Sequence, residues 1–249
     1  MTPTPDPAFY SPLRAAVIGA SGGIGGQLVA ALAQKPGVGD VFAFSRTPAT
    51  IDAEGVSALA IDILDESSIA AAAETAHAEG PLDIVIVATG ILHDGDLQPE
   101  KAMRELDAGR MARVFELNTI APTMLAKHFL PVLRRKHKTV FAALSARVGS
   151  ISDNRLGGWT SYRASKAALN MTLRNLAIEH ARRFPNSIIA ALHPGTVETG
   201  LSKPFQKRVP DGQLFTAARS AGHLLDVVDN LEASDSGGFF AWDGSRIDY

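Results

Sequence analysis

The chain contains no cysteine, which excludes disulfide bonds and thiolate chemistry and fits a reducing compartment. It also lacks a strong excess of charge of either sign, because its formal net charge is only -2, and this argues against binding to nucleic acid or anionic lipid. The longest apolar stretch, residues 84–92, is about half of a membrane span. The N-terminal residues have neither the basic nor the apolar part of a signal peptide. We therefore expect a cytoplasmic protein that contacts neither nucleic acid nor membrane.

Metal-ligand patterns are missing as well. The 7 histidines show no spacing typical of ligands, so we predict no metal site. His193, which precedes Pro194, is better explained as a packed residue at a strand end than as a catalyst. The one basic run, residues 134–138, falls where a helix should end, so we expect it to cap the last turn and to face water.

Apolar runs of strand length alternate with longer amphipathic segments along most of the chain. This alternation is typical of a parallel sheet with helices on both faces. With 46% apolar residues and no internal repeat or linker, the chain can form one full core. The expected strands cover residues 15–18, 41–44, 57–61, 84–88, 139–144, 188–193 and 238–242.

Helices are expected between these strands, over residues 24–34, 67–78, 111–135, 161–183 and 216–230. Asp65 is placed to cap the second of them, and Pro122 and Pro131 should bend the third. We therefore predict an α/β fold with a doubly wound, seven-stranded parallel sheet. It forms a single domain over residues 14–249, preceded by a disordered Pro-rich N-terminus at residues 1–13.

A glycine-rich segment follows the first expected strand directly and opens the first expected helix. Glycine lets the chain turn sharply and brings backbone N–H groups and the helix N-terminus against a pyrophosphate. In this strand–turn–helix context the segment predicts a dinucleotide site. The residues assigned to it are Gly19, Ser21, Gly22, Gly23, Ile24 and Gly25. A tight turn with close helix packing is the alternative interpretation.

The end of the second expected strand indicates which dinucleotide is bound. A site for NAD would place an acid there to bind the ribose 2′-OH, but the chain has Phe44-Ser45-Arg46-Thr47. The planar guanidinium of Arg46 suits a 2′-phosphate, and Ser45 offers a hydroxyl beside it. We therefore expect NADP(H) to be preferred over NAD(H), with a merely solvated arginine as the alternative.

Tyr162 and Lys166 lie four residues apart on an expected helix, which sets a phenol beside an ammonium. A nearby cation stabilises the phenolate and brings the tyrosine pKa toward the working range, so the pair predicts acid–base chemistry on a carbonyl or alcohol. A pair at this spacing is expected by chance in about a tenth of chains of this composition. An exposed helix face is therefore the alternative.

With these motifs in order, the chain resembles the short-chain dehydrogenase/reductase family of Rossmann-fold enzymes over roughly residues 14–242. The matching residues are Gly19, Gly23 and Gly25, Asp62-Ile63 after the third strand, Asn118, Tyr162 with Lys166, and Pro194-Gly195. Residues 147–154 and 239–244 are similar to the C-factor and sniffer-like carbonyl reductase branch.

The resemblance implies a role for each matched position. Tyr162 would protonate the carbonyl oxygen as hydride arrives from the nicotinamide, and Lys166 would lower the pKa of Tyr162 and bind the nicotinamide ribose. Asn118 would hold a water that passes protons from Lys166 to solvent. Thr199 would bind the carboxamide, and Asp62 would meet the adenine. The other cofactor contacts implied are Ile63, Ala88, Thr89, Gly90, Pro194, Gly195 and Val197.

The chain departs from the family pattern at the substrate-orienting serine. The match through residues 147–150 puts Ala146 at that position, one residue after Ser145. Because successive strand residues point to opposite faces, an offset of one would turn Ser145 away unless the chain bends first. We expect Ser145 to substitute, with Ser150 as the next candidate and no serine as the remaining one. Smaller departures are Ile18 before the first glycine and residues 87–90 in place of Asn-Asn-Ala-Gly.

The function expected is that of an NAD(P)-dependent short-chain oxidoreductase, and specifically an NADPH-dependent carbonyl reductase acting on a small carbonyl or alcohol substrate. The alternative is a dinucleotide-binding signalling protein that has lost turnover, motivated by Ala146 and by the C-factor resemblance. An extended sugar-nucleotide epimerase would need a larger C-terminal domain than the seven residues that follow Trp242. The helices beginning at Met111 and Ser161 carry apolar residues on more than one face, and the family suggests a homodimer or homotetramer.

Overall fold

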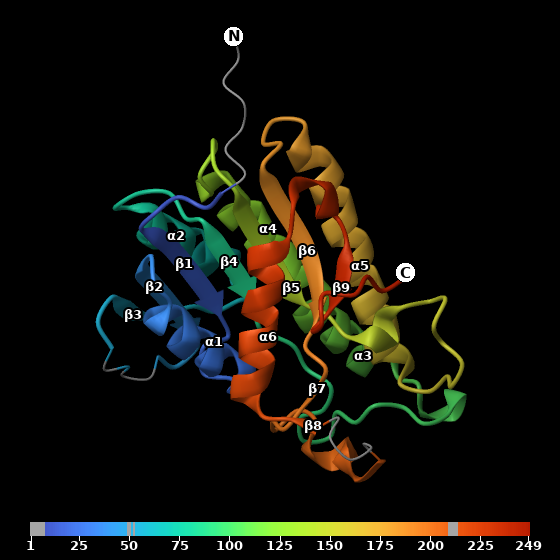
Figure 1. Cartoon of the computed structure of the whole chain (residues 1–249). Coiled ribbons are helices and arrows are strands. Elements are labelled where there is room, and N and C mark those ends of the chain that lie inside the picture. The colour runs from blue at the N-terminus through green and yellow to red at the C-terminus, as the bar shows by residue number, and fades with distance from the viewer. Residues whose placement is uncertain (1–7, 49–50, 52, 209–213) are drawn as a thin grey trace.

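The computed structural model describes residues 8–48, 51, 53–208 and 214–249. Seven strands form one sheet in the order β3-β2-β1-β4-β5-β6-β9, and every neighbouring pair is parallel (Figure 1). This confirms the predicted doubly wound, seven-stranded sheet. The strands are β1 (Leu13–Ile18), β2 (Val38–Ser45), β3 (Val56–Ala60), β4 (Ile84–Val87), β5 (Thr139–Leu144), β6 (Ser187–His193) and β9 (Phe239–Ala241).

Helices cover both faces of the sheet, because alternate residues of each strand point to opposite sides. In β1, Ala15 and Val17 join a core with α1 (Gly23–Gln34) and α6 (Ala217–Asn230). Ala16 and Ile18 join the core on the other face, with α2 (Glu66–His77), α4 (Ala121–Phe129) and α5 (Thr160–Ala181). Figure 1 shows these two layers on either side of the strands. A two-stranded ribbon of β7 (Thr196–Val197) and β8 (Leu214–Phe215) was not predicted.

The helix predicted over residues 111–135 is broken in the structure. It consists of α3 (Ala108–Phe115), the π-turn η2 (Glu116–Ile120), α4 and the short 3₁₀ turn η3 (Leu130–Val132). Leu133 is extended, so the helical path ends soon after Pro131, which has no N–H to donate. The cap predicted at Asp65 is confirmed, since its side chain accepts a hydrogen bond from the Ser67 N–H.

The basic run at residues 134–138 does not cap a helix, and the prediction that it faces water is wrong for two of its members. Lys138 is 7% exposed, and its Nζ donates to the carbonyl of Asp229 at 2.6 Å. Arg134 Nε lies 2.5 Å from Asp83 Oδ1. Lys138 therefore connects the start of β5 to the C-terminal end of α6, and Arg134 connects the segment before β5 to the residue before β4.

The N-terminal segment was predicted to be disordered through residue 13, but Leu13 is the first residue of β1. Phe9 packs beside the α1/α6 core and lies under Lys138 Nζ, 4.6 Å from its ring centre. Tyr10 lies under the Arg134 guanidinium at 3.9 Å, and Leu13 already belongs to β1. Aromatic side chains therefore attach this segment to the sheet. Residues 1–7, the rest of the predicted disordered segment, lie outside the described residues.

At the amino edge of the sheet, Asp83 is fully buried and accepts hydrogen bonds from the Arg14 backbone N–H at 3.0 Å and from Arg134 Nε. Replacing Asp83 with Ala should lower the free energy of unfolding by about 3 kcal/mol, because two buried donors lose their acceptor. Urea denaturation measures this. The matched control is Asp153→Ala, which breaks the exposed pair with Arg147 and should leave the midpoint unchanged. Equal midpoint shifts in the two variants would contradict the assignment.

Candidate active site

The glycine segment makes a tight turn between β1 and α1. Gly19 has a φ of +96°, and its N–H and that of Ala20 both donate to the Phe44 carbonyl of β2 at 2.9 Å. A Cβ on Gly25 would lie 2.1 Å from the carbonyl oxygen of Gly19, so only glycine allows this approach. Gly22 caps α1 without any side-chain hydrogen bond, which leaves the first N–H groups of the helix directed at the site.

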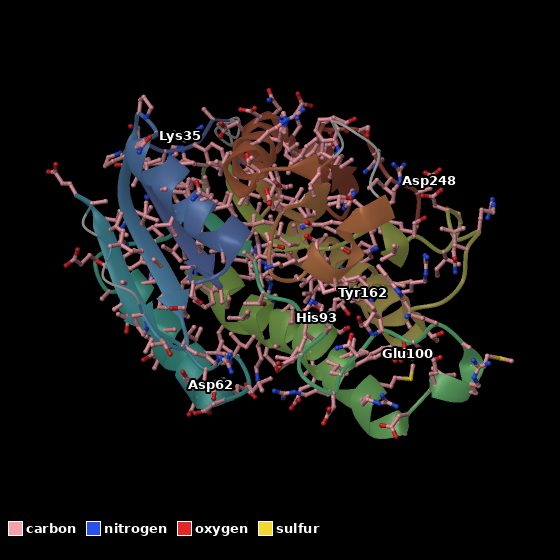
Figure 2. The ribbon with its side chains drawn as sticks, turned by 90° about the horizontal axis from the view of Figure 1, so that it is seen from below. Lys35, Asp62, His93, Glu100, Tyr162 and Asp248 are labelled. Carbon is pink, nitrogen blue, oxygen red and sulfur yellow. The ribbon has the colours of Figure 1, made fainter. Side chains whose placement is uncertain are left out.

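A pocket of about 310 Å³ lies at the carboxyl ends of the strands, beside the point where the strand order reverses between β1 and β4. Figure 2 looks onto this edge of the sheet, with Tyr162 near its middle. The pocket brings together residues from the glycine turn, the ends of β4 and β5, helix α5 and the segment after β6. Its lining is Gly22, Gly23, Ile24, Ala88, Thr89, Gly90, Leu144, Ser145, Tyr162, Lys166, Pro194, Thr199, Gly200 and Leu201.

Several features of this pocket fit a nicotinamide dinucleotide. Thr89 Oγ1 is buried and has no hydrogen-bond partner among the described residues, so a donor is available next to the glycine turn. Gly23 approaches Thr199 so closely that a Cβ would lie 2.9 Å from its methyl group. The uncapped helix N-terminus and the unpartnered Thr89 hydroxyl both offer donors that suit the phosphates of such a cofactor.

The positions predicted for the adenosine end lie farther along the same edge. Ser45 is buried at the end of β2, and its hydroxyl donates to the Thr47 carbonyl at 3.0 Å. Arg46, the next residue, is exposed. Asp62 is exposed after β3 and accepts from the Leu64 N–H at 2.9 Å, and Ile63 packs against the core.

Tyr162 and Lys166 lie in the first turns of α5 and are 9% and 3% exposed. Lys166 Nζ donates to the carbonyl of Leu144, the last residue of β5, at 2.8 Å. Burial raises the pKa of Tyr162 to about 12 and lowers the pKa of Lys166 to about 8. The direction for Tyr162 is opposite to the expected one, and its cause is burial of the phenol. At neutral pH the phenol is therefore protonated and the ammonium is charged.

Asn118 lies in the π-turn η2 and is fully buried. Its Oδ1 accepts from the Ile91 N–H, and its Nδ2 donates to the Ile91 carbonyl, both at 2.8 Å. A Cβ on Gly90 would lie 3.3 Å from Asn118 Oδ1 and 3.4 Å from Lys166 Nζ. Because Gly90 has no Cβ, the side chains of Asn118 and Lys166 can both lie close to its backbone. Such π-turns are frequent at functional sites.

Ser145 lines the pocket, but its hydroxyl donates to Asn170 Oδ1 at 2.7 Å. Because a hydroxyl has one hydrogen, Ser145 cannot donate to a second acceptor in this conformation. Ser150 lies outside the pocket lining, and its Oγ accepts from the Asp153 N–H at 3.1 Å. Ala146 has no donor in its side chain. His193 is packed at the end of β6, as expected, and burial lowers its pKa to about 4.

After β6 the structure separates the predicted contacts. Pro194 and Thr199 line the pocket. Gly195 has a φ of +79° and lies beneath an aromatic pair, since a Cβ would come within 2.7 Å of the Phe215 ring and 3.2 Å of Trp242. Val197 is buried in β7. These two residues support the pocket wall from behind rather than lining it.

Residues that sequence reasoning missed come mainly from the segment after β4. His93 Nε2 lies 3.1 Å from the carbonyl oxygens of both Gly200 and Leu201, which line the pocket. Glu100 contacts the start of α5. Figure 2 shows His93 and Glu100 on the same side of the molecule as Tyr162. No spacing in the sequence indicates these contacts, because each joins segments far apart in the chain.

A family model for short chain dehydrogenases matches residues 14–210. The chain belongs to the short-chain dehydrogenase family. It is 33% identical over 168 residues to the C-signal of Myxococcus xanthus, a match that covers 68% of this chain and 93% of that protein. It is 29% identical over 252 residues to an uncharacterized oxidoreductase of Schizosaccharomyces pombe, covering 94% of this chain and 96% of the other.

Solved structures resemble this short-chain dehydrogenase over almost its whole length. The NADPH-bound carbonyl reductase from chicken fatty liver matches with a TM-score of 0.82 at 28% identity, covering 97% of this chain and 96% of that one. The carbonyl reductase Sniffer of Drosophila melanogaster, at 22% identity, has the same fold, with a TM-score of 0.80 and coverage of 95% and 100%. The protein is therefore an NAD(P)-dependent oxidoreductase with a Rossmann-like fold, as its sequence predicted.

No group of three or more His, Asp or Glu side chains in residues 8–48, 51, 53–208 and 214–249 is arranged to hold a metal ion. Within the same ranges, no helix combines the length and the apolar character needed to cross a membrane.

Replacing Lys166 with Met should stabilise this dehydrogenase at pH 7, in the absence of cofactor, by about 1–2 kcal/mol. The pKa of Lys166 falls from 10.5 to about 8 on folding, so the folded state holds this proton less tightly than the unfolded state. That difference opposes folding by roughly 3 kcal/mol at pH 7. Loss of the bond to the Leu144 carbonyl offsets roughly 1 kcal/mol of the gain.

Because the pKa of Lys166 is lowered on folding, the stabilisation by Lys166→Met depends on pH. The penalty is complete below pH 8 and disappears as the pH rises from about 8 to 10.5, so the advantage of Lys166→Met should shrink at pH 10. Urea denaturation at pH 7 and pH 10 measures it. Lys127→Met, which removes an exposed cation paired with Glu66, serves as the control and should show no such trend. A variant less stable than the wild type at pH 7 would refute the assignment.

Proposed function

We propose that this short-chain dehydrogenase is an NADPH-dependent carbonyl reductase that transfers hydride to a ketone or aldehyde, with Tyr162 as the general acid. The observation that carries this proposal is a buried phenol in the same pocket as the glycine turn. A protonated phenol is a donor and suits the reduction of a carbonyl. The chicken carbonyl reductase, bound to NADPH, supports the assignment by its likeness over the whole chain.

Several residues of this chain would hold the cofactor. The N–H groups at Gly23 and Ile24 would bind the pyrophosphate, with Gly19, Ser21, Gly22 and Gly25 forming the turn, in which the Gly22 N–H donates to the Gly19 carbonyl at 3.0 Å. Asp62 and Ile63 border the adenine, and Ala88, Thr89 and Gly90 border the ribose and pyrophosphate. Lys166 binds the nicotinamide ribose and Thr199 the carboxamide. Gly195 and Val197 keep Pro194 and Thr199 in place. When bound, NADPH supplies a hydride from C4 of its nicotinamide.

The preference for NADP(H) over NAD(H) rests on Arg46. The Ser45 hydroxyl already donates to the Thr47 carbonyl, so the exposed guanidinium of Arg46 carries the recognition of a 2′-phosphate. The chain has no acidic residue directly after β2, where a 2′-OH would be bound.

Proton transfer is assigned to Tyr162, Lys166 and Asn118. The Tyr162 phenol donates to the carbonyl oxygen as negative charge develops on it. Lys166, with a pKa lowered to about 8, can give up a proton near neutral pH more readily than an exposed lysine. We assign to Asn118 a water that links Lys166 to solvent, held beside Gly90, where no Cβ intrudes.

Ser145 is proposed to orient the substrate oxygen. In the described conformation its hydrogen goes to Asn170, so this role requires rotation about its side-chain torsion toward the pocket that it lines. The other candidate, Ser150, is engaged with the Asp153 N–H outside that lining.

Tyr162→Phe should lower kcat for carbonyl reduction by about 10²–10⁴, because the general acid is lost while the ring still fills its site. The assay follows NADPH absorbance with a panel of small ketones, aldehydes and quinones, and fluorescence titration checks that NADPH still binds. Ser145→Ala should lower kcat by about tenfold. The proposal fails if the wild type binds NADPH tightly but reduces none of the panel, or if Tyr162→Phe retains full activity.

Arg46→Ala should raise the KM for NADPH by about 10–100-fold and leave the KM for NADH unchanged, because a charge-assisted contact with the 2′-phosphate contributes roughly 1.5–3 kcal/mol. Steady-state kinetics with both cofactors measures the change. Arg113→Ala, which removes an exposed arginine paired with Glu116, is the matched control. Parallel changes for both cofactors would show that Arg46 does not read the 2′-phosphate.

A regulatory protein that binds the dinucleotide without turnover is the second candidate. The observation in its favour is that the Ser145 hydroxyl is engaged with Asn170, together with 33% identity to a protein named C-signal. The buried Tyr162–Lys166 pair argues against it, because burial of an ammonium opposes folding and a sensor does not require it. A biological activity that survives Tyr162→Phe would favour this candidate.

A homodimer or homotetramer and a cytoplasmic location stay predictions of the sequence. Met171 and Ile178 are exposed on α5, and Ile120 is exposed at the end of η2. These side chains support the proposal that copies of the chain associate through apolar surface.

A further inference from the structure

Helix α5 carries Tyr162 but begins without a cap of its own. Its N-cap residue, Trp159, has a left-handed φ of 52°, and its side chain does not cap the first turn. The first N–H groups of a helix have no acceptor within it, so they need partners from elsewhere. Gly157 and Gly158 also have positive φ values, which shows that the chain makes a sharp approach to the helix.

The missing acceptor comes from Glu100, about sixty residues earlier in the chain. Its side chain is buried, with only 6% exposed, and its Oε2 accepts from the Ser161 N–H at 3.2 Å. Its Oε1 accepts from the Ser161 hydroxyl. The Glu100 carbonyl accepts from the Trp159 N–H at 2.5 Å. One residue therefore holds both the N-cap position and the first turn of α5.

The charge of Glu100 fits this location. A carboxylate is stabilised near a helix N-terminus, where the peptide dipoles concentrate positive charge. Burial of a carboxylate is unfavourable unless hydrogen bonds satisfy it, and Ser161 provides two of them. The sequence neighbour of Ser161 is Tyr162, so these bonds lie one residue from the phenol-bearing position. The Trp159 ring also contacts the Tyr162 ring edge-on, with centres 6.4 Å apart.

The segment that contains Glu100 is fixed at its other end to the same site. Ile91 exchanges two hydrogen bonds with the Asn118 side chain, both at 2.8 Å. Residues 91–100 thus connect Asn118 to the first turn of α5, and Asn118 also bonds α5 directly, since its Nδ2 donates to Ser165 Oγ at 3.2 Å. A change at Glu100 therefore acts on the first turn of α5, at Ser161, while the bond at Ser165 keeps the next turn beside Asn118.

We propose that Glu100 is a positioning residue for Tyr162: by capping α5 from residues 91–100, it sets the place of the phenol in the pocket. Its effect on turnover rests on the proposed carbonyl reduction, and its effect on the environment of Tyr162 does not.

The direct test observes Tyr162 itself in the full-length protein. The chain has 3 tyrosines, so labelling with [¹³Cζ]tyrosine gives three resonances, and Tyr162→Phe identifies the one from Tyr162. Glu100→Ala should shift or broaden the Tyr162 resonance and leave those of Tyr10 and Tyr249 in place. Glu100→Gln, which keeps an acceptor but not the charge, should give a smaller change. An unmoved Tyr162 resonance in folded Glu100→Ala overturns the proposal.

The matched control is Glu105→Gln, because Glu105 follows the same segment and accepts from the Lys101 N–H rather than from α5. It should leave all three resonances unchanged. If Glu100→Ala fails to fold, Glu100→Gln decides, and an unmoved Tyr162 resonance in that variant overturns the proposal. A shift of the Tyr162 resonance in Glu105→Gln as large as in the Glu100 variants also overturns it, since the effect would then not be specific to the cap.

Kinetics test whether Glu100 acts through Tyr162. Glu100→Ala should lower kcat by about 10–100-fold, the effect of misplacing a reacting group by roughly 1 Å, and leave NADPH binding unchanged. In the Tyr162→Phe background the same change should cause no further loss, because the two effects share one group. Additive losses overturn the proposal. A wild type that reduces no carbonyl refutes the proposed function alone, and the resonances still decide on Glu100.

Discussion

The hydrogen bond from Lys166 Nζ to the Leu144 carbonyl joins helix α5 to the end of strand β5, and the rest of the site depends on it. It requires an ammonium to lose almost all contact with water, which is unfavourable and lowers the lysine pKa. The same bond places Tyr162, one helical turn earlier, at the carboxyl edge of the sheet beside the glycine turn. The buried Lys166 ammonium therefore lowers the free energy of unfolding and at the same time helps to form the pocket. Such a conflict between stability and function is common at functional sites.

Most of the fold could be predicted from the sequence, because its signals are local. The β1 strand, the turn at Gly19 and helix α1 follow one another within a short segment, and each has its own pattern of apolar residues or glycine. The break in the helix over residues 111–135 was missed, because a π-turn around Asn118 has no compositional signature and depends on the partners that Asn118 finds at Ile91. Tyr162 and Lys166 line the same pocket, as their spacing on one helix allows.

Properties that depend on three-dimensional surroundings were predicted less well. The direction of the Tyr162 pKa shift was wrong, since spacing shows the neighbouring cation but not the extent of burial. The basic run at residues 134–138 was expected to face water, because nothing in the local sequence indicates that Arg134 contacts Asp83 or that Lys138 contacts the Asp229 carbonyl. The contact of Glu100 with α5 could not be predicted, because no local pattern distinguishes this carboxylate from others in loops and the contact forms only in the folded chain.

For the proposed role of Ser145 in orienting the substrate oxygen, its hydrogen bond to Asn170 has a consequence for timing. The amide oxygen of Asn170 is a strong acceptor, and a neutral ketone oxygen competes with it poorly. An oxygen that gains negative charge during reduction becomes the better acceptor and can attract the hydroxyl hydrogen at that moment. A serine held in this way would bind the transition state more strongly than the ground state. It would therefore accelerate turnover without raising the affinity for the unreacted ketone.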